Sequence, residues 1–424
     1  MTSVLKERML VTSARVGDAV PPALLALLLA QSALVIVAHT VFSLLGLPGA
    51  LGSLLVYALL AIAVAAALPA ILRRADRRVG LVGALLLCAF AVGALLGQGS
   101  EQFYSQIAAR LLIGLGWMTV AYAVRDYRQC RRYLYPAGLV TLVAVGIQLS
   151  AASSGATMAA TYSQEIGYSA LPAVLIFVDA AFERMRFLNG ALAVVSGWMM
   201  LSSGARGPIV VAALYILARV VLQVRASPRL AVVVAGVGVL ATWLAAQFVG
   251  DYLAALQLLL ERFGLSTRVV ARLQEGSLLE DRARTELIQH TFNLIAQHPF
   301  AGVGMSNERP ILAKLMGAAP DTEAIGWYPH NVFLELLAQF GVILGALLIL
   351  LLLTAILRAV VTSKDLDRRA LVLVFVGLGL LPLLFSASYL SWPTFFGLLG
   401  LCLSNNAPPP PAPLGRSHRD ASRD

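Results

Sequence analysis

Charged residues are scarce in this 424-residue chain: they make up 13% of it, whereas hydrophobic residues make up 59%. A soluble domain of average composition carries about 25% charged residues, so the deficit excludes an ordinary globular enzyme. The mean hydropathy is +0.81. Apolar stretches of roughly 20 residues, the length that crosses about 30 Å of hydrocarbon, recur along the whole chain. The composition therefore predicts a polytopic membrane protein.

Cysteine is also rare, and no nucleotide or metal motif is present. The three cysteines, Cys88, Cys130 and Cys402, have no metal-ligand spacing and predict no disulfide framework. The sequence contains no P-loop, Rossmann glycine pattern or zinc signature, which argues against ATP-driven transport. Asp321 and Glu323 are spaced like a carboxylate pair for a divalent cation, but no further oxygen ligand is spaced for one. We predict a solvated loop there, and neither a metal nor another cofactor.

The apolar stretches form twelve runs. Helix is the only secondary structure expected for them, because a backbone exposed to lipid must satisfy its hydrogen bonds within the segment. The approximate limits of the runs are 21–45, 50–71, 79–97, 105–124, 134–152, 167–182, 188–203, 208–224, 230–249, 330–357, 370–387 and 392–404. The predicted fold class is an all-α polytopic membrane protein with about 12 transmembrane helices.

The positive charges predict the orientation of these helices. The formal net charge of +10 comes mostly from short clusters between apolar runs, which argues against a nucleic-acid partner. With the N-terminus inside, the cytoplasmic loops hold Arg73, Arg74, Arg77, Arg78, Arg125, Arg128, Arg131, Arg132, Arg184, Arg186, Arg225, Arg229, Arg358, Lys364, Arg368 and Arg369. The short outer loops at 98–104, 153–166 and 388–391 contain no Lys or Arg, in agreement with the positive-inside rule. Both termini are therefore predicted to be cytoplasmic in a bacterial inner membrane, with a disordered tail at 405–424.

One connection between the runs is much longer than the others. Residues 250–329 are too polar to span a membrane, and the predicted orientation places them in the periplasm. Long loops are translocated regardless of charge, so their arginines do not contradict this orientation. A loop of this length in a compact protein is usually functional. We therefore divide the chain into transmembrane helices 1–9 at 1–249, a periplasmic loop with a catalytic lid helix at 250–329, transmembrane helices 10–12 at 330–404, and the tail at 405–424.

Within this loop, residues 281–297 (DRARTELIQHTFNLIAQ) predict an amphipathic helix. One face at helical spacing is formed by Leu287, Ile288, Thr291, Leu294 and Ile295. Arg284 lies on the same inward face. An arginine on a buried face needs a partner, which could be an anionic ligand or an acid of the loop, namely Glu308, Asp321 or Glu323. The helix is expected to end at His298-Pro299, and Gly302 and Gly304 predict a turn after it.

The segment SGARG at 203–207 joins the predicted outer end of the seventh run to the eighth. Arg206 would lie near the membrane boundary, either as an anchor to lipid headgroups or as a phosphate ligand that uses its guanidinium fork. A headgroup could approach the backbone beside the small residues Ser203, Gly204 and Gly207. Arg110, near the outer end of the fourth run, either pairs with Glu101 or adds to a positive outer pocket.

Pro329-His330-Asn331 opens the long tenth run. His330 is expected in the first helical turn, either as a hydrogen-bonded interfacial residue or as a general base, for which an unshifted imidazole suits neutral pH. Asn331, Glu335 and Gln339 follow at i, i+4 and i+8 and form one polar stripe. Such a stripe should face the bundle interior or a wet cavity rather than lipid. We favour the general base for His330.

Together these motifs resemble the O-antigen ligase family, the lipid A–core:surface polymer ligases. They are Ser-Gly-x-Arg-Gly at 203–207, HPFAGVG at 298–304 after Arg284, and PHNVFLELLAQFG at 329–341. The resemblance covers about residues 196–345 by motif, and the twelve-run layout extends it to the whole chain. The same superfamily contains O-antigen polymerases and O-linking oligosaccharyltransferases.

The resemblance implies an inverting, metal-independent glycosyltransferase of lipopolysaccharide biosynthesis. Such ligases move a glycan from undecaprenyl diphosphate to a sugar of the lipid A–core oligosaccharide in the periplasm. By position, His330 matches the proposed general base, and Arg206 and Arg284 match the arginines proposed to hold the diphosphate. The expected partners are this donor, this acceptor and membrane lipid. Other residues expected in the substrate site are Ser203, Gly204, Gly207, Asn331, Glu335 and Arg110.

Other functions stay open from the sequence. An O-antigen polymerase would use the same donor, but polymerases of this kind typically have two sizeable outer loops with arginines, and this sequence has one. An O-linking oligosaccharyltransferase would need a polypeptide groove, which the sequence neither indicates nor excludes. A lipid-linked glycan flippase or transporter would place its ionisable residues near the mid-membrane and would often contain inverted repeats. Glu335 and Gln339 are the features that favour this last alternative.

Overall fold

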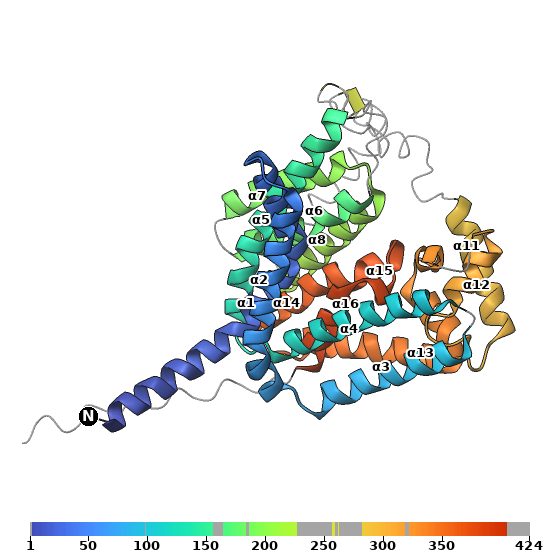
Figure 1. The fold of residues 1–424 in the computed structure, drawn as a ribbon, viewed down its shortest axis with the longest axis horizontal. Coiled ribbons are helices and arrows are strands. Elements are labelled where there is room, and N and C mark those ends of the chain that lie inside the picture. Colours follow the sequence, from blue (N-terminus) through green and yellow to red (C-terminus); the bar gives the residue numbers. More distant parts are fainter. Residues whose placement is uncertain are drawn as a thin grey trace, which may run out of the picture.

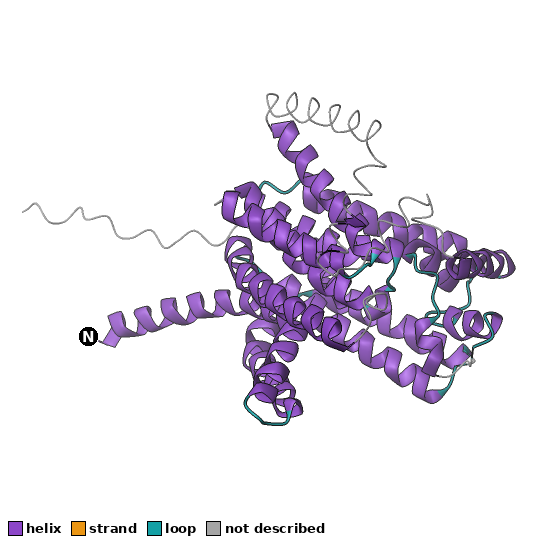
Figure 2. Cartoon of the chain, turned by 90° about the horizontal axis from the view of Figure 1, so that it is seen from above, coloured by secondary structure: helices purple, strands orange, loops and turns teal. Residues whose placement is uncertain are grey.

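The computed structural model describes residues 2–97, 99–155, 164–183, 186–226, 257–258, 262, 282–318 and 322–404. The described residues form helices, turns and loops, and no strand (Figures 1 and 2). The expected run at 230–249, most of the loop before residue 282 and the tail at 405–424 lie outside the described residues. The all-α fold class is confirmed for the part of the chain that the structure describes.

Apart from two helices in the polar loop, the described helices each overlap a predicted apolar run, although the first begins well before its run, at Thr2. They are α1 (Thr2–Leu44), α2 (Gly49–Arg74), α3 (Arg77–Leu96), α4 (Glu101–Ala123), α5 (Tyr127–Gly155), α6 (Gln164–Glu183), α7 (Arg186–Ser202), α8 (Arg206–Ala226), α11 (Arg282–Gln297), α12 (Glu308–Leu315), α13 (Val332–Val361), α14 (Leu366–Phe375), α15 (Leu381–Phe385) and α16 (Pro393–Leu403). A π-helical segment, Val376–Leu380, joins α14 to α15. Short 3₁₀ turns lie at Thr322–Gly326 and Tyr389–Ser391.

Nine helices in the described part of the chain are long and apolar enough to cross a membrane. The helices α7 and α16 also match predicted runs, but they have only 17 and 11 residues. At 1.5 Å per residue, α16 covers roughly 16 Å, about half of a typical hydrocarbon core. The run at 392–404 is therefore shorter as a helix than the full span expected for it, and the total of twelve spans stays a prediction.

The helix bundle has two ends of different character. The loop end comprises α12, the start of α13, the segment 386–391 and the adjoining ends of α3 and α4. There the Tyr104 hydroxyl donates to Asn307 Oδ1 at 2.7 Å, and Asn307 Nδ2 donates to the Gly93 carbonyl at 2.8 Å. Figure 1 shows α11 and α12 together on this side, opposite the N-terminal part of α1.

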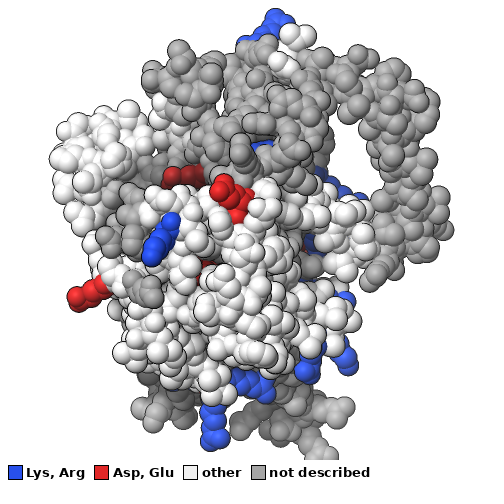
Figure 3. All heavy atoms as spheres, turned by 90° about the vertical axis from the view of Figure 1, so that its right-hand side faces the viewer, with Lys and Arg blue, Asp and Glu red and all other residues white. Residues whose placement is uncertain are grey.

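The basic end comprises the start of α5 and α14 and the ends of α2, α4, α6 and α16. Arg74 Nη1 donates to the Ala123 carbonyl at 3.1 Å, and Arg368 Nη2 donates to the Ser404 carbonyl at 2.9 Å. These contacts hold Arg74 and Arg368, which the sequence assigns to short loops between spans, at this end of the bundle. Seen from the side of α11 and α12, the surface of the described residues is mostly uncharged, with scattered basic and acidic side chains (Figure 3).

The loop segment 298–304 packs its backbone against a break in α13. Gly341 interrupts this helix with φ 74° and ψ 173°. Two N–H groups of the segment donate to the carbonyls of Ala338 and Gln339, each at 2.9 Å, and the N–H of Val342 donates back to the segment at 2.7 Å. Because buried backbone groups need hydrogen-bond partners, the loop satisfies the groups that the break in the helix exposes.

Glycine is required on both sides of this contact. Gly302 has φ +66°, and a Cβ atom there would lie 2.4 Å from the Gln339 carbonyl. A Cβ atom on Gly341 would lie 2.4 Å from the carbonyl oxygen of Phe300. The predicted turn after α11 is confirmed, and its glycines allow two backbones to touch.

We expect Gly302→Ala to lower the free energy of unfolding by about 2–5 kcal/mol, because it adds a steric clash to the strain of a left-handed residue. Thermal unfolding of the detergent-purified protein measures this. Gly317→Ala is the matched control, since Gly317 has φ +76° but open space around its Cα. This control should lower the free energy of unfolding only by the left-handed backbone strain, about 1–2 kcal/mol. Equal losses in the two variants would show that the backbone contact is unimportant.

Candidate active site

His330 lies at the loop end, two residues before α13 begins at Val332, and not in the first helical turn where the sequence predicted it. Its backbone is left-handed, with φ 54°, an uncommon conformation for a residue other than glycine. The ring nitrogen Nδ1 lies 3.1 Å from the carbonyl oxygen of Ser386. A carbonyl only accepts hydrogen bonds, so Nδ1 carries the proton and, in the neutral ring, Nε2 carries the lone pair. This tautomer presents Nε2 as a base.

Asn331 explains why α13 begins directly after His330. Its side-chain oxygen accepts hydrogen bonds from the N–H groups of Phe333 and Leu334, at 3.0 and 3.3 Å, which is a helix N-cap. Its Nδ2 donates to the carbonyl of Leu384 at 3.4 Å. The cap and the contact with Leu384 hold the backbone beside His330. Asn331, predicted to bind substrate, therefore has a structural role in this arrangement.

Tyr328 joins the histidine to the predicted arginines. Its ring lies 4.4 Å from that of His330, between centroids, and its hydroxyl donates to the Ser386 carbonyl at 3.1 Å. Burial raises the pKa of Tyr328, whereas the positive charges of Arg309, Arg110 and, to the least extent, Arg284 oppose that rise. Positive charge from Arg110 and Arg284 thus acts on the residue whose ring lies beside that of His330.

The two arginines reach this place from different elements. Arg110, on α4, donates from Nη1 to Ser391 Oγ at 2.6 Å, rather than to Glu101. Arg284 is half-buried on α11, on the same face as the buried Leu287, as the helical spacing predicts. Glu308, one acid proposed as its partner, instead accepts a hydrogen bond from Gln339.

The turn before Arg206 packs against the same group of residues. Gly204 has φ +67°, and Ser203 Oγ closes the turn by donating to the Met200 carbonyl at 2.7 Å. A Cβ atom on Gly207 would lie 2.5 Å from the Tyr168 hydroxyl and 2.8 Å from Ser386 Oγ. Because the Ser386 carbonyl also holds His330, the start of α8 and the histidine contact the same residue.

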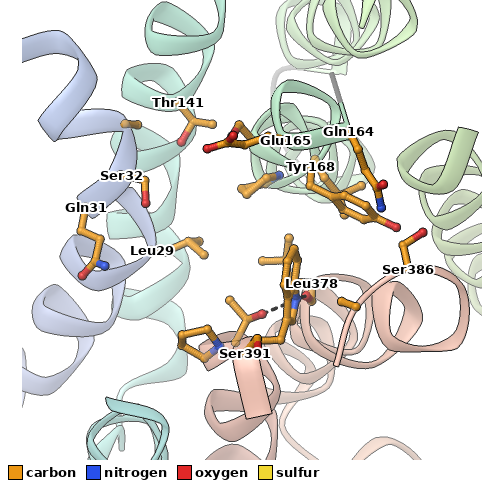
Figure 4. A pocket seen from close by; sticks show the side chains of 18 of the residues that line it. Leu29, Gln31, Ser32, Thr141, Gln164, Glu165, Tyr168, Leu378, Ser386 and Ser391 are labelled. Carbon is orange, nitrogen blue, oxygen red and sulfur yellow. Dashed lines mark hydrogen bonds between the residues drawn. The ribbon is translucent and has the colours of Figure 1, made fainter. Parts of the chain in front are cut away.

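A pocket of about 610 Å³ opens beside His330. Figure 4 shows its walls, which include Gln31 and Ser32 of α1, Thr141 of α5, Gln164, Glu165 and Tyr168 of α6, and Ser386 and Ser391. Tyr168 packs edge-on against Trp392, with 5.4 Å between ring centroids. No Lys or Arg of the described residues lines this space. The pocket therefore lies on the histidine side of the site, and the arginines lie outside its wall.

A buried network of charged and polar side chains contacts the ring of Tyr328. Arg309 is fully buried, and its guanidinium lies 5.1 Å from the centroid of the Tyr328 ring. Arg309 donates from Nη1 to the Ile325 carbonyl at 2.8 Å, and from Nη2 to Glu335 at 3.3 Å and to Ser388. Ser388 Oγ also donates to Glu335 at 2.5 Å. The network connects α12, α13 and the 3₁₀ turn at Tyr389–Ser391.

The polar stripe of α13 is the other half of this network. Glu335 and Gln339 are fully buried, which confirms that the stripe faces the protein interior. Gln339 donates to Glu308 at 2.8 Å and accepts from the Tyr389 hydroxyl at 2.5 Å. Glu335, predicted to bind substrate, contacts Arg309 and Ser388 and does not line the pocket beside His330.

No pattern in the sequence singles out Arg309, Tyr328 or Ser386. Arg309 was one of several charges in a polar loop, and nothing in its local pattern indicates burial. The available signal was indirect: the polar stripe at Glu335 and Gln339 needs partners inside the protein, and the Glu308-Arg309 pair could supply them.

Comparison with known proteins agrees with the predicted family. Residues 191–349 match the family model described as O-Antigen ligase. The match runs from α7 into α13 and includes Arg206, Arg284, Arg309 and His330. No curated protein and no solved structure gave a significant match. The match supports the O-antigen ligase family and a glycosyltransferase-like role in the assembly of O-antigen or lipopolysaccharide.

We expect Arg309→Lys to lower both stability and glycan transfer. A lysine ammonium cannot make the forked contacts with Ile325, Ser388 and Glu335, and the loss should be about 1–3 kcal/mol of unfolding free energy. Thermal unfolding and glycan transfer per folded molecule are the measurements. Arg368→Lys is the matched control: Arg368 is 3% exposed and donates to two carbonyls at the basic end. A similar loss of transfer in both variants would assign the effect to stability alone.

We expect Glu308→Gln to flatten the pH dependence of stability. Burial raises the pKa of Glu308 above its ordinary value of 4.5, the nearby Glu335 raises it further, and Arg309 opposes them. The native state thus binds this proton more tightly than the unfolded chain, and stability falls as pH rises from 4.5 towards the raised pKa. Melting temperatures across that range should decline less in the variant. Glu101→Gln, at an exposed site, should leave the slope unchanged.

Proposed function

We propose that this chain, whose residues 191–349 match the family model described as O-Antigen ligase, is an inverting, metal-independent glycosyltransferase. It moves O-antigen glycan from undecaprenyl diphosphate to the lipid A–core oligosaccharide at the periplasmic face of the inner membrane. The observation that carries this proposal is His330, whose Nδ1 is bound to the Ser386 carbonyl next to Tyr328 and the surrounding arginines.

The arginines supply positive charge for the donor. A lipid diphosphate keeps its phosphates near the membrane surface, where Arg206 enters from α8 and Arg284 from α11. Guanidinium forks bind phosphate oxygens through two charge-assisted hydrogen bonds. As the glycosidic bond breaks, negative charge develops on the leaving diphosphate, and donors positioned at that oxygen stabilise the transition state. Arg110 adds a third positive charge from α4.

His330 acts on the acceptor. Its Nε2 takes the proton of an acceptor hydroxyl, whose oxygen then forms a bond with the anomeric carbon of the donor sugar. The bond from that carbon to the phosphate oxygen breaks, and undecaprenyl diphosphate leaves with the electron pair. Attack from the side opposite the diphosphate inverts the anomeric configuration. General-base catalysis of this kind typically contributes about 10²–10⁴-fold.

The buried network argues against the transporter alternative. Glu335 and Gln339, the features that favoured it, make hydrogen bonds to Arg309, Ser388, Glu308 and Tyr389. They therefore hold the loop to α13 instead of lining the pocket beside His330. The polymerase alternative shares the donor chemistry and is separated from the ligase by the acceptor.

We expect His330→Asn to lower attachment of O-antigen to lipid A–core by about 10²–10⁴-fold, because it removes the base. Asparagine tolerates the left-handed backbone, so the fold should be kept. Arg206→Ala and Arg284→Ala should each lower attachment by about 10²–10³-fold. The measurement is complementation of a strain that lacks its ligase, followed by assay of the purified proteins with and without EDTA, which should not change the rate.

His298→Ala serves as the matched control, since His298 is an exposed histidine of the same loop. It should attach O-antigen normally. Each variant must be present in the membrane at the level of the wild type. Normal attachment in all three site variants would falsify the mechanism. If attachment proceeds and lipid-linked chains fail to lengthen, the chain is a polymerase.

A further inference from the structure

A second pocket of about 640 Å³ lies at the basic end, away from the site around His330. We call it the basic-end pocket. It is bounded by the start of α5, the end of α6, the start of α7 and the start of α14. The residues that form it include Arg128, Arg131, Arg132, Asp179, Glu183 and Asp367. Three basic and three acidic side chains thus face one cavity, and the proposed transfer reaction uses none of them.

Arg131 forms the floor of the basic-end pocket. Its side chain is 9% exposed and contacts Asp179 at 2.5 Å, Asp367 at 2.7 Å and Glu183. Asp179 is bound in addition by Arg219 at 3.0 Å. Burial of these charges is tolerated because each is paired. The floor is therefore an ion-pair cluster that joins α5, α6, α8 and α14.

Arg128 and Arg132 form the rim of the pocket. They lie three residues before and one residue after Arg131 on the first turns of α5, and both are exposed. Neither has an ion-pair partner within the described part of the chain. The acids on the rim keep exposed surface: the side chain of Glu183 is 41% exposed and that of Asp367 is 33% exposed. The rim thus offers both unpaired cations and accessible carboxylates.

The position of the pocket relative to the apolar helices indicates what reaches it. Three candidate spans, Tyr127–Ala151, Gln164–Glu183 and Leu366–Phe385, each have one end at this pocket. The pocket therefore lies at the level where a lipid leaflet changes from hydrocarbon to headgroups. Its deeper wall is apolar and includes Leu134, Ile176 and Val374. Basic pockets between helices at such boundaries bind lipid phosphates.

We propose that the basic-end pocket binds the headgroup of a zwitterionic aminophospholipid, of the phosphatidylethanolamine type. Arg128 and Arg132 hold the phosphate, and guanidinium forks suit its oxygens. Glu183 and Asp367 accept hydrogen bonds from the primary ammonium. An acyl chain follows the apolar wall into the bundle. A quaternary choline headgroup cannot donate those hydrogen bonds, and phosphatidylglycerol lacks the positive group that the carboxylates attract.

The test measures the full-length protein in nanodiscs of phosphatidylcholine that contain either phosphatidylethanolamine or phosphatidylglycerol. We expect native mass spectrometry to find retained phosphatidylethanolamine on the wild type, together with a higher melting temperature than in phosphatidylcholine alone. Arg128→Gln/Arg132→Gln should lose both effects, and Glu183→Gln should weaken them. Inorganic phosphate and free ethanolamine should leave the melting temperature unchanged, which separates a lipid headgroup from its soluble parts.

Arg77→Gln/Arg358→Gln is the matched control, since both arginines are exposed at the basic end and lie outside the pocket. It should retain phosphatidylethanolamine as the wild type does. Equal loss in the two double variants would assign the effect to general surface charge and overturn the proposal. Equal retention of phosphatidylglycerol by the wild type would overturn the choice of headgroup, and stabilisation by phosphate alone would indicate an anion site.

Discussion

The arrangement of the loop end depends on one buried guanidinium. Arg309 is brought by the loop into the protein interior, where an unpaired charge would be strongly destabilising. Its contacts with Glu335 of α13, with Ser388 and with the carbonyl of Ile325 pair the charge and engage both terminal nitrogens of the guanidinium. A buried ion pair often contributes little net stability relative to apolar packing. The role of this ion pair is to fix the relative positions of α12, the start of α13 and the segment around Ser388.

The position of Arg309 affects that of His330 through Tyr328 and Ser386. Arg309 lies against one side of the Tyr328 ring, and the His330 ring lies against Tyr328. One carbonyl, that of Ser386, accepts from both the tyrosine hydroxyl and the histidine ring. A residue held in an uncommon backbone conformation persists only when its surroundings determine it. Here those surroundings are the cap at Asn331, the Ser386 carbonyl and the ring of Tyr328 with the buried charge of Arg309 beside it.

The two ends of the bundle differ in where their charged side chains lie. At the loop end, the buried side chains of Arg309 and Glu335 lie beside Tyr328, whose ring contacts that of His330. At the basic end, Arg131 is enclosed by three carboxylates, whereas Arg128 and Arg132 stay exposed on the rim. At both ends the buried charges are paired, and at the basic end Arg128 and Arg132, which have no ion-pair partner among the described residues, lie at the surface. This division follows from the cost of burying a charge without a partner.

The sequence by itself determined most of the described helices and predicted the O-antigen ligase family, whose model residues 191–349 match, whereas the residues named for catalysis stay predictions. Helical runs can be read from composition because a chain in lipid must pair its backbone locally. The buried face of α11 follows from the spacing of Leu287, Thr291 and Leu294, which are buried as predicted. Only the tertiary structure decided that Asn331 donates to the Leu384 carbonyl, that Glu335 binds Arg309, and that Ser386 positions His330. These pairs join residues as far as 56 positions apart for Ser386 and His330, and such contacts arise from packing between helices, which no local pattern encodes.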